Sequence, residues 1–296
     1  MGRMTRSGPV LRLTGETVRR RPDTLVVEEP LEIRVAGRPF VVTMRTPGHD
    51  VELALGFLVG EGVVSAPEHV RRAERCGLDG AREAVASGAD PSDVVAAREL
   101  ADNVLEVDLA AGVARPEASL ERSVYTSSSC GVCGTASIDG VRKASAFAVR
   151  DDPLVVAAEV LAALPDRLRD AQKVFARTGG LHAVGLFDAS GALVCVREDV
   201  GRHNAFDKVV GWALQQGRLP LAGHVVLVSG RASFELVQKA WTAGVPLLAA
   251  VSAPSSLAVD LAHEAGMTLV GFLRGETMNV YAGGRRVGAG RREVRG

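Results

Sequence analysis

The sequence has few of the features that mark a secreted, membrane-spanning or nucleic-acid-binding protein. No apolar run in its 296 residues approaches the roughly 20 residues that a membrane-spanning helix needs. The four cysteines lack the spacing of a disulfide framework. The formal net charge is zero, which disfavours a generally basic nucleic-acid binder. We therefore expect a cytoplasmic protein that binds no nucleic acid and inserts into no membrane.

Other absences narrow the chemistry. The chain has no G-x-x-x-x-G-K-[ST] phosphate loop and no G-x-G-x-x-G fingerprint, which disfavours ordinary NTP hydrolysis and dinucleotide redox reactions. Residues 1–22 are rich in arginine but lack the apolar region of a secretory signal, so we expect a flexible tail there. The chain contains only four lysines, and arginine provides almost all of its positive charge. Arginine suits phosphate recognition, although codon bias accounts for most of these residues.

The most informative segment that is present is the loop 127–137, which holds Cys130 and Cys133 in a C-x-x-C pair among serines and glycines. Such a pair is half of a zinc site, a redox dithiol, or a relay that carries a transferable sulfur. Two small buried hydrophobic residues are the fourth interpretation, disfavoured because the neighbours offer no apolar face. Cys76 and Cys195 are isolated and receive no role.

The sequence pattern of the N-terminal half predicts a small α+β part over residues 23–126. Alternating apolar residues on either side of a glycine-containing turn predict a hairpin over 31–45. Asp50 is placed to cap a helix over 51–59. Residues 68–102 are rich in alanine and charge and predict a poorly ordered or loosely helical insertion. A short strand is expected over 104–109.

The C-terminal half has a different pattern, in which apolar strands alternate with helices. Two consecutive helices are expected over 154–164 and 165–175. The remaining expected strands are 182–187, 192–197, 225–229, 245–251, 268–273 and 278–281, and the remaining helices are 202–216, 234–242 and 256–265. A hairpin followed by βαβαβ predicts an α/β fold, a three-layer sandwich with a mixed sheet, in a domain over 138–284. Residues 285–296 are expected to form a C-terminal tail.

Three loops follow strands of this sheet where open α/β sheets bind ligands. Ser229, Gly230 and Arg231 lie in the first, residues 252–256 form the second, and residues 272–277 form the third. Glycine lets the backbone approach a ligand, and arginine can bind a phosphate through two parallel N–H donors. Three such loops, two of them with arginine, favour an anionic ligand such as a nucleotide.

A polar segment over 198–208 lies where another strand leads into a helix. It has two interpretations, a helix cap at Asp199 with surface ion pairs, or a network beside the ligand. His203 is a zinc ligand, a base or a half-buried structural histidine, the last being commonest. His182 follows a flexible turn, and we assign it no catalytic role.

Taken in order, these motifs resemble the FdhD (FdhD/NarQ) family of formate dehydrogenase accessory sulfurtransferases. The resemblance covers nearly the whole chain. Its segments are 46–50, 60–62, the C-x-x-C loop, 178–182, 198–204, 229–231 and 272–277. A C-x-x-C pair alone is unspecific, but this ordered set is specific.

The resemblance implies a cytidine-deaminase-like fold and a sulfur-carrier function. A cysteine desulfurase would pass persulfide sulfur to Cys130, with Cys133 as its partner. The protein would pass the sulfur to the molybdenum cofactor, bis(molybdopterin guanine dinucleotide), before that cofactor enters formate dehydrogenase. The stretch expected to contact this bound substrate comprises Phe272, Leu273, Arg274, Gly275, Glu276 and Thr277. No metal and no tightly held cofactor of the protein's own are expected, and the family implies a homodimer.

Three alternatives compete with this interpretation. A zinc-stapled cofactor-binding chaperone would use Cys130, Cys133 and two histidines as ligands. A zinc deaminase is disfavoured because no H-x-E precedes the cysteines and Ser129 replaces the usual proline. A dithiol oxidoreductase would need its C-x-x-C pair between a strand and a helix, and this loop lacks that context.

Overall fold

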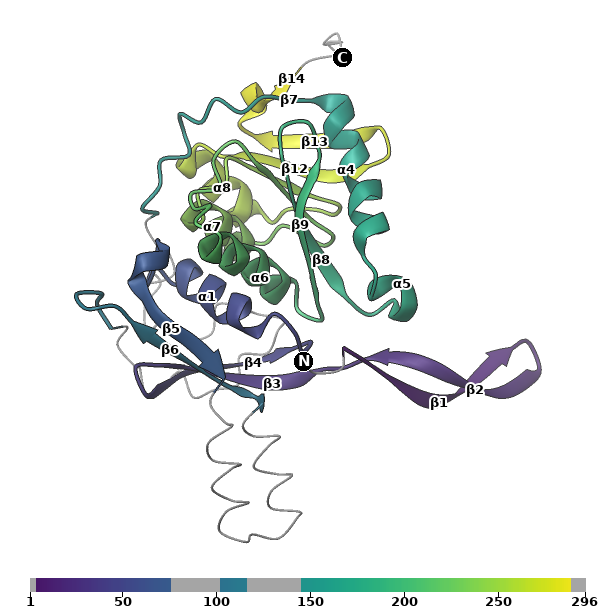
Figure 1. The fold of residues 1–296 in the computed structure, drawn as a ribbon. Helices are drawn as coiled ribbons and strands as arrows, with labels where there is room; N and C mark the ends of the chain where they lie inside the picture. Colours follow the sequence, from purple (N-terminus) through teal and green to yellow (C-terminus); the bar gives the residue numbers. More distant parts are fainter. Residues whose placement is uncertain (1–3, 76–101, 116–144, 289–296) are drawn as a thin grey trace, which may run out of the picture.

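The computed structural model describes residues 4–75, 102–115 and 145–288 (Figure 1). The C-x-x-C loop with Cys130 and Cys133, most of the expected insertion and the end of the expected C-terminal tail lie outside these residues.

A six-stranded mixed sheet forms the centre of the larger part, in the order β13-β12-β11-β10-β8-β9. Its strands are β8 (His182–Phe187), β9 (Leu193–Asp199), β10 (Val225–Val228), β11 (Leu247–Ala250), β12 (Thr268–Arg274) and β13 (Thr277–Ala282). Strands β10, β11 and β12 are parallel, whereas β8 pairs antiparallel with both β9 and β10, and β13 pairs antiparallel with β12. The predicted hairpin followed by parallel strands is confirmed.

Helices cover both faces of this sheet (Figure 1). They are α4 (Ala158–Ala171), α6 (Arg202–Gln215), α7 (Phe234–Thr242) and α8 (Ser256–Ala265). Alternate residues of the buried strands face opposite layers. Val225 and Leu227 share a core with Leu164 of α4, whereas Val226 and Val228 belong to the core beneath α6, α7 and α8. The predicted three-layer α/β sandwich is confirmed.

The N-terminal part is a four-stranded sheet in the order β4-β3-β6-β5, with α1 (Asp50–Gly60) between it and α6. Its strands are β3 (Glu29–Val35), β4 (Arg38–Arg45), β5 (Val70–Arg75) and β6 (Val104–Leu109). Glycines let α1 and α6 approach closely. A Cβ on Gly56 would lie 1.8 Å from the carbonyl oxygen of Asp207, and a Cβ on Gly211 would lie 1.8 Å from that of Glu52. The two parts of the molecule therefore meet along a tight helix crossing.

The flexible tail expected over residues 1–22 is wrong. Strands β1 (Thr5–Thr14) and β2 (Thr17–Val26) pair as an antiparallel hairpin that projects from the molecule (Figure 1). The missed signal is a two-residue turn that begins with Gly15, whose φ is +58°, between runs with alternating apolar residues. The arginines hid this alternation.

Three further boundaries differ from expectation. The start of the expected insertion is ordered, because η1 (Pro67–His69) and the edge strand β5 occupy it. The two helices expected over 154–175 are mainly one, α4, which continues through Pro165 and is followed by the short α5 (Phe175–Thr178). Asp50 does not cap α1, because His49 holds the N-cap position.

The expected C-terminal tail also begins too early. Arg286, in η4 (Gly284–Arg286), is only 1% exposed and donates hydrogen bonds to the carbonyl oxygens of Val149 and Gly266. Strand β14 (Val287–Gly288) then pairs with β7 (Val156–Ala157). Residues 285–288 therefore belong to the domain. Among the described residues, no helix is long and apolar enough to cross a membrane.

Candidate functional site

The three expected ligand loops lie side by side at the carboxyl ends of β10, β11 and β12. The Ser252 amide donates to the carbonyl oxygen of Gly230 at 3.3 Å, and the Phe272 amide donates to the carbonyl oxygen of Ser252 at 3.2 Å. Each loop is thus hydrogen-bonded to the next. Parallel strands bring their carboxyl ends to one edge, so this arrangement follows from the topology.

A groove with a volume of about 270 Å³ runs between these loops and α4. Its lining residues are Pro165, Asp166, Leu168, Arg169, Gln172, Ser229, Val251, Leu273, Arg274 and Gly275. Four of the residues that the sequence nominates are therefore on its wall: Ser229, Leu273, Arg274 and Gly275. The contribution of α4 was not predicted, because no sequence signal connects that helix with loops more than fifty residues away.

The remaining nominated residues lie beside the groove rather than on its wall. Gly230 is next to Ser229, and the exposed Arg231 follows it. Phe272, Glu276 and Thr277 are exposed, and the Thr277 hydroxyl donates to the carbonyl oxygen of Arg274 at 3.0 Å. Phe272, Glu276 and Thr277 therefore lie in the same segment as Arg274, whereas Gly230 and Arg231 lie in the loop after β10.

The end of β12, just before its turn into β13, has an unusual backbone. Phe272 has a φ of +50°, although it is not glycine and its side chain is 40% exposed. A register shift separates Gly271 from Arg274 in the pairing with β13. A Cβ on Gly271 would lie 2.8 Å from the Cδ of Pro254, so only glycine fits there. Such strained, bulged backbone is concentrated at ligand sites, where it aims side chains that regular pairing would direct elsewhere.

Arg274 is fixed at the mouth of the groove by its own strand neighbours. Its Nε donates to the carbonyl oxygen of Val251 at 3.0 Å. This bond uses one of its five N–H donors, and the guanidinium remains exposed. The arrangement presents a positioned positive charge to an anion in the groove.

His182 lies at the other end of the sheet edge that carries the ligand loops. A Cβ on Gly230 would lie 3.5 Å from its Nδ1, so the first ligand loop passes against the imidazole. The Ala183 amide donates to the Ser229 hydroxyl oxygen at 2.9 Å. Burial, and then the positive charge of Arg202, lower the pKa of His182 below its ordinary value of 6.5. The imidazole is therefore neutral at pH 7.

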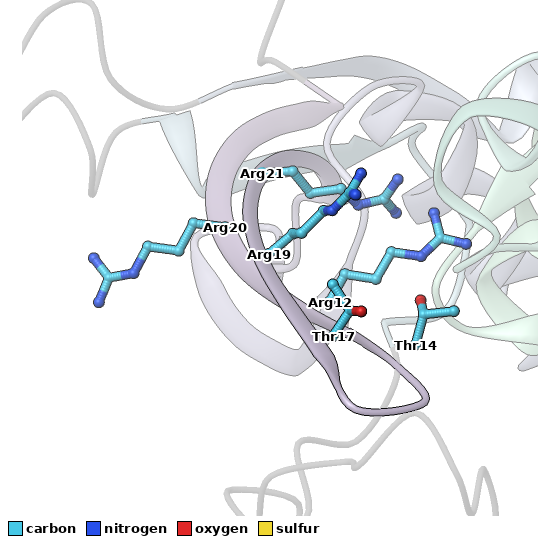
Figure 2. A pocket seen from close by; sticks show the side chains of 6 residues that line it. All are labelled: Arg12, Thr14, Thr17, Arg19, Arg20 and Arg21. Atoms are coloured by element: carbon cyan, nitrogen blue, oxygen red, sulfur yellow. The ribbon is translucent and has the colours of Figure 1, made fainter.

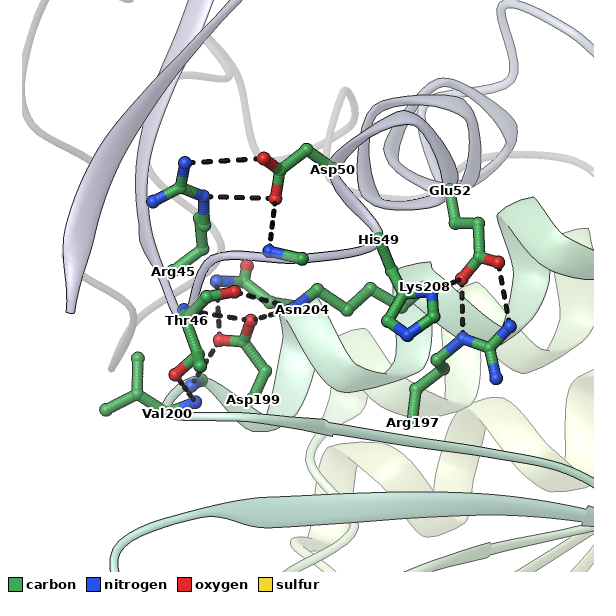
Figure 3. A network of polar contacts seen from close by, with 12 residues as sticks. Arg45, Thr46, His49, Asp50, Glu52, Arg197, Asp199, Val200, Asn204 and Lys208 are labelled. Carbon is green, nitrogen blue, oxygen red and sulfur yellow. Dashed lines mark hydrogen bonds and ion pairs between the residues drawn. The ribbon is translucent and has the colours of Figure 1, made fainter. Parts of the chain in front are cut away.

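The polar segment 198–208 is a buried network that joins the two parts of the molecule (Figure 3). Asp199 and Lys208 are both fully buried, and the Lys208 Nζ donates to Asp199 Oδ2 at 2.6 Å. The same carboxylate accepts hydrogen bonds from the amide of Thr46 and from Asn204 Nδ2. Asp199 is therefore neither a helix cap nor a surface ion pair, because Gly201 holds the N-cap position of α6.

A further ion pair lies at the same boundary, and a contact of His203 lies within the larger part. Glu52 of α1 accepts from Arg197 Nε at 2.5 Å and Nη2 at 2.7 Å (Figure 3). His203 is buried, with its Nε2 3.0 Å from a carboxylate oxygen of Glu235 and 3.3 Å from the Ser233 hydroxyl oxygen. His203, which we expected to be half-buried, is thus buried between α6 and α7 with polar neighbours.

The described residues contain no group of three or more His, Cys, Asp or Glu side chains that could hold a metal ion. Cys195, the one cysteine among them, is buried, and burial raises the pKa of its thiol to about 11. Its thiolate is therefore scarce at neutral pH, which makes it a poor nucleophile.

The chain is similar to known proteins along almost its whole length. The model of the FdhD/NarQ family matches residues 26–288. The chain is 56% identical over 288 residues to sulfur carrier protein FdhD of Streptomyces avermitilis, with 97% of each chain covered. It is also 56% identical over 287 residues to sulfur carrier protein FdhD of Mycobacterium tuberculosis, covering 97% of this chain and all of that one.

A solved structure has the same fold. The crystal structure of a Desulfotalea psychrophila protein, assigned as a formate dehydrogenase accessory protein, superposes with a TM-score of 0.71. The alignment covers 96% of this chain and all of the other, at 22% identity.

Proposed function

This chain belongs to the FdhD/NarQ family, and we propose that it is a sulfur carrier that serves formate dehydrogenase. The observation that carries the proposal is the similarity to proteins named sulfur carrier protein FdhD along 97% of the chain. The C-x-x-C loop supplies the sulfur chemistry, and the groove at the sheet edge supplies a place for an anionic substrate.

We assign the persulfide to Cys130 and the resolving thiol to Cys133. A cysteine desulfurase transfers a sulfur atom to the Cys130 thiolate and leaves a persulfide. The Cys133 thiolate then attacks the inner sulfur of that persulfide, a Cys130–Cys133 disulfide forms, and the outer sulfur leaves as hydrosulfide. The two thiols are oxidised and the transferred sulfur is reduced, so the step needs an external reductant only to regenerate the dithiol.

The acceptor in this proposal is the molybdenum cofactor, bis(molybdopterin guanine dinucleotide), bound as a substrate. Hydrosulfide is a soft ligand that suits the metal. The groove beside Ser229 and Arg274, at about 270 Å³, lies just below the volume of ligand pockets, roughly 300–1,000 Å³, so we assign it to part of one guanosine diphosphate end of the cofactor. Arg274 and Arg231 would bind its phosphates by charge and by their forked N–H donors.

Sulfur loading tests the proposal. The protein is incubated with a cysteine desulfurase and cysteine, and its peptides are analysed by mass spectrometry. We expect one additional sulfur on the Cys130 peptide and none in Cys130→Ala. Cys195→Ala is the matched control and should load like the wild type, because the Cys195 thiol is buried.

The same samples address the alternative, a zinc-stapled chaperone. An unloaded Cys130 peptide beside a demonstrably active desulfurase, together with near-stoichiometric zinc in the purified protein, would favour the chaperone. A homodimer is also part of the proposal, and sedimentation of the purified protein measures it.

A further inference from the structure

The hairpin formed by β1 and β2, called the arm here, is not explained by the sulfur-carrier proposal. None of its residues is buried, and β2 contacts α5 of the larger part. A two-stranded ribbon without a third strand or a covering helix is marginally stable in water. The arm therefore lacks the packing that would normally hold such a hairpin together.

The arm has two unlike faces, which follow from its register. Arg12 lies directly opposite Arg19, and Arg21 lies opposite Val10 on the same face. Figure 2 shows the side chains of Arg12, Arg19 and Arg21 on one side of the ribbon and that of Arg20 on the other. A hollow of about 550 Å³ lies along the basic side. The lining residues are Arg12, Thr14, Thr17, Arg19, Arg20 and Arg21.

Arg12, Arg19 and Arg21 form no ion pair within the part of the chain that the structure describes, although the register places Asp23 on the same face, opposite Gly8. Residues 5–26 contain five arginines and only two carboxylates, Glu16 and Asp23. Like charges directly opposite each other destabilise a strand pair, and an anionic partner relieves this repulsion.

The other face is apolar and exposed. Leu11, Leu13 and Val18 are 57%, 69% and 58% exposed, and Leu13 pairs with Val18. The arm contains no aromatic side chain on which a nucleic-acid base would stack. A protein surface that combines carboxylates with apolar residues suits the arm. Its carboxylates would pair with the arginines, and its apolar residues would pack on the exposed aliphatic side chains.

The position of the arm beside the ligand loops indicates which partner it contacts. Its base lies at the edge that carries the ligand loops, since a Cβ on Gly180 would lie 3.5 Å from the Val26 Cγ1, and His182 follows two residues later. The family model begins at residue 26, where the arm ends. A protein that grips the arm is thus held beside the groove, where it can take the substrate.

We propose that the arm is a docking surface for a protein with an acidic, partly apolar surface, namely the apoenzyme of formate dehydrogenase that receives the cofactor. This proposal rests on the proposed function for the identity of the partner. The arginine face steers and orients the acceptor, and the aliphatic face adds the apolar contact. Sulfur loading by the desulfurase does not require the arm.

Two exposed arginines provide the test. Arg19→Glu changes the charge on the basic face of the arm, and Arg38→Glu makes the same change at the start of β4, at the end of the β3–β4 hairpin away from the arm. Binding of immobilised apo-formate dehydrogenase is measured by interferometry at low and at physiological salt. We expect Arg19→Glu to weaken binding by about tenfold or more at low salt and to reduce its salt dependence, and Arg38→Glu to change it by about twofold or less.

Control measurements keep the outcomes distinct. Circular dichroism and sulfur loading should match the wild type in both variants. Equal effects of the two substitutions would overturn the proposal. So would an Arg19→Glu defect that instead concerns self-association, desulfurase binding, or binding to anionic vesicles or duplex DNA. If the wild type fails to load sulfur but its apoenzyme binding depends on Arg19, the carrier function is wrong and the docking surface stands.

Discussion

At the scale of single residues, Arg274 carries the proposed recognition of the phosphates. Its guanidinium is exposed at the groove mouth and tethered through one hydrogen bond to Val251. We expect Arg274→Ala to weaken GDP binding by about tenfold, the effect of losing a charge-assisted contact with an anion. Arg38→Ala, which replaces the exposed arginine that begins β4, is the control. Isothermal titration measures both, and an unchanged affinity in Arg274→Ala would remove this residue from the site.

The Glu52–Arg197 pair gives the protein a defined pH dependence. Burial acts to raise the pKa of Glu52, but the hydrogen bonds and charges of Arg197 and His49 outweigh it and hold that pKa below its ordinary 4.5. A carboxylate with a lowered pKa stabilises the folded state above its unfolded pKa, and this contribution disappears as pH falls through the folded value. We expect stability to decline below pH 4.5.

Urea unfolding of the wild type and of Glu52→Gln, followed between pH 3 and pH 7, measures this contribution. At pH 7 the substitution should cost about 2 kcal/mol, since it leaves the half-buried Arg197 without its carboxylate. The difference between the two proteins should shrink as the pH falls. A difference that stays constant over the whole range would contradict the assignment.

At the scale of elements, the crossing of α1 and α6 depends on glycine. At an ordinary helix position, Gly→Ala stabilises by up to about 1 kcal/mol. At Gly56 or Gly211 the added methyl group would meet the backbone of the facing helix at 1.8 Å. We expect either Gly→Ala variant to lose about 3 kcal/mol of stability or more. Gly284→Ala is the control, because its nearest new contact would be an ordinary 3.8 Å. Thermal unfolding of the three variants decides the point.

Elements whose patterns are local were predictable from the sequence. Helices α7 and α8 begin and end where expected, since each follows a serine at its N-cap and has an apolar face. The parallel strands are short apolar runs that only a doubly covered sheet accommodates. Pro165 misled the prediction because proline usually ends a helix, whereas α4 continues through it.

The parts of the site that escaped prediction depend on contacts between distant residues. Asp199 meets Thr46 across 153 positions of sequence, and nothing in either segment indicates the other. The α4 wall of the groove escaped for the same reason. The loops of Ser229 and Phe272 were predictable, because both follow buried strands at the edge where such sheets bind ligands.

At the scale of the whole molecule, the two parts are fastened to each other at the helix crossing, with the ligand edge on one side and the arm beginning beside it (Figure 1). This arrangement places the carboxyl ends of the strands, where we propose that the anionic substrate binds, and the arm, where we propose that the partner docks, at one end of the protein (Figure 1). The proposed carrier role therefore predicts two events, the loading of sulfur onto the protein and the transfer of that sulfur to the substrate.

The most direct measurement of that claim is a single-turnover chase. The protein is loaded with ³⁵S from labelled cysteine, separated from the desulfurase, and mixed with the molybdenum cofactor and apo-formate dehydrogenase. We predict that the label moves from the Cys130 peptide to the cofactor and that formate oxidation appears at the same rate, with neither in Cys130→Ala. Label that remains on the protein while the enzyme becomes active would contradict the account.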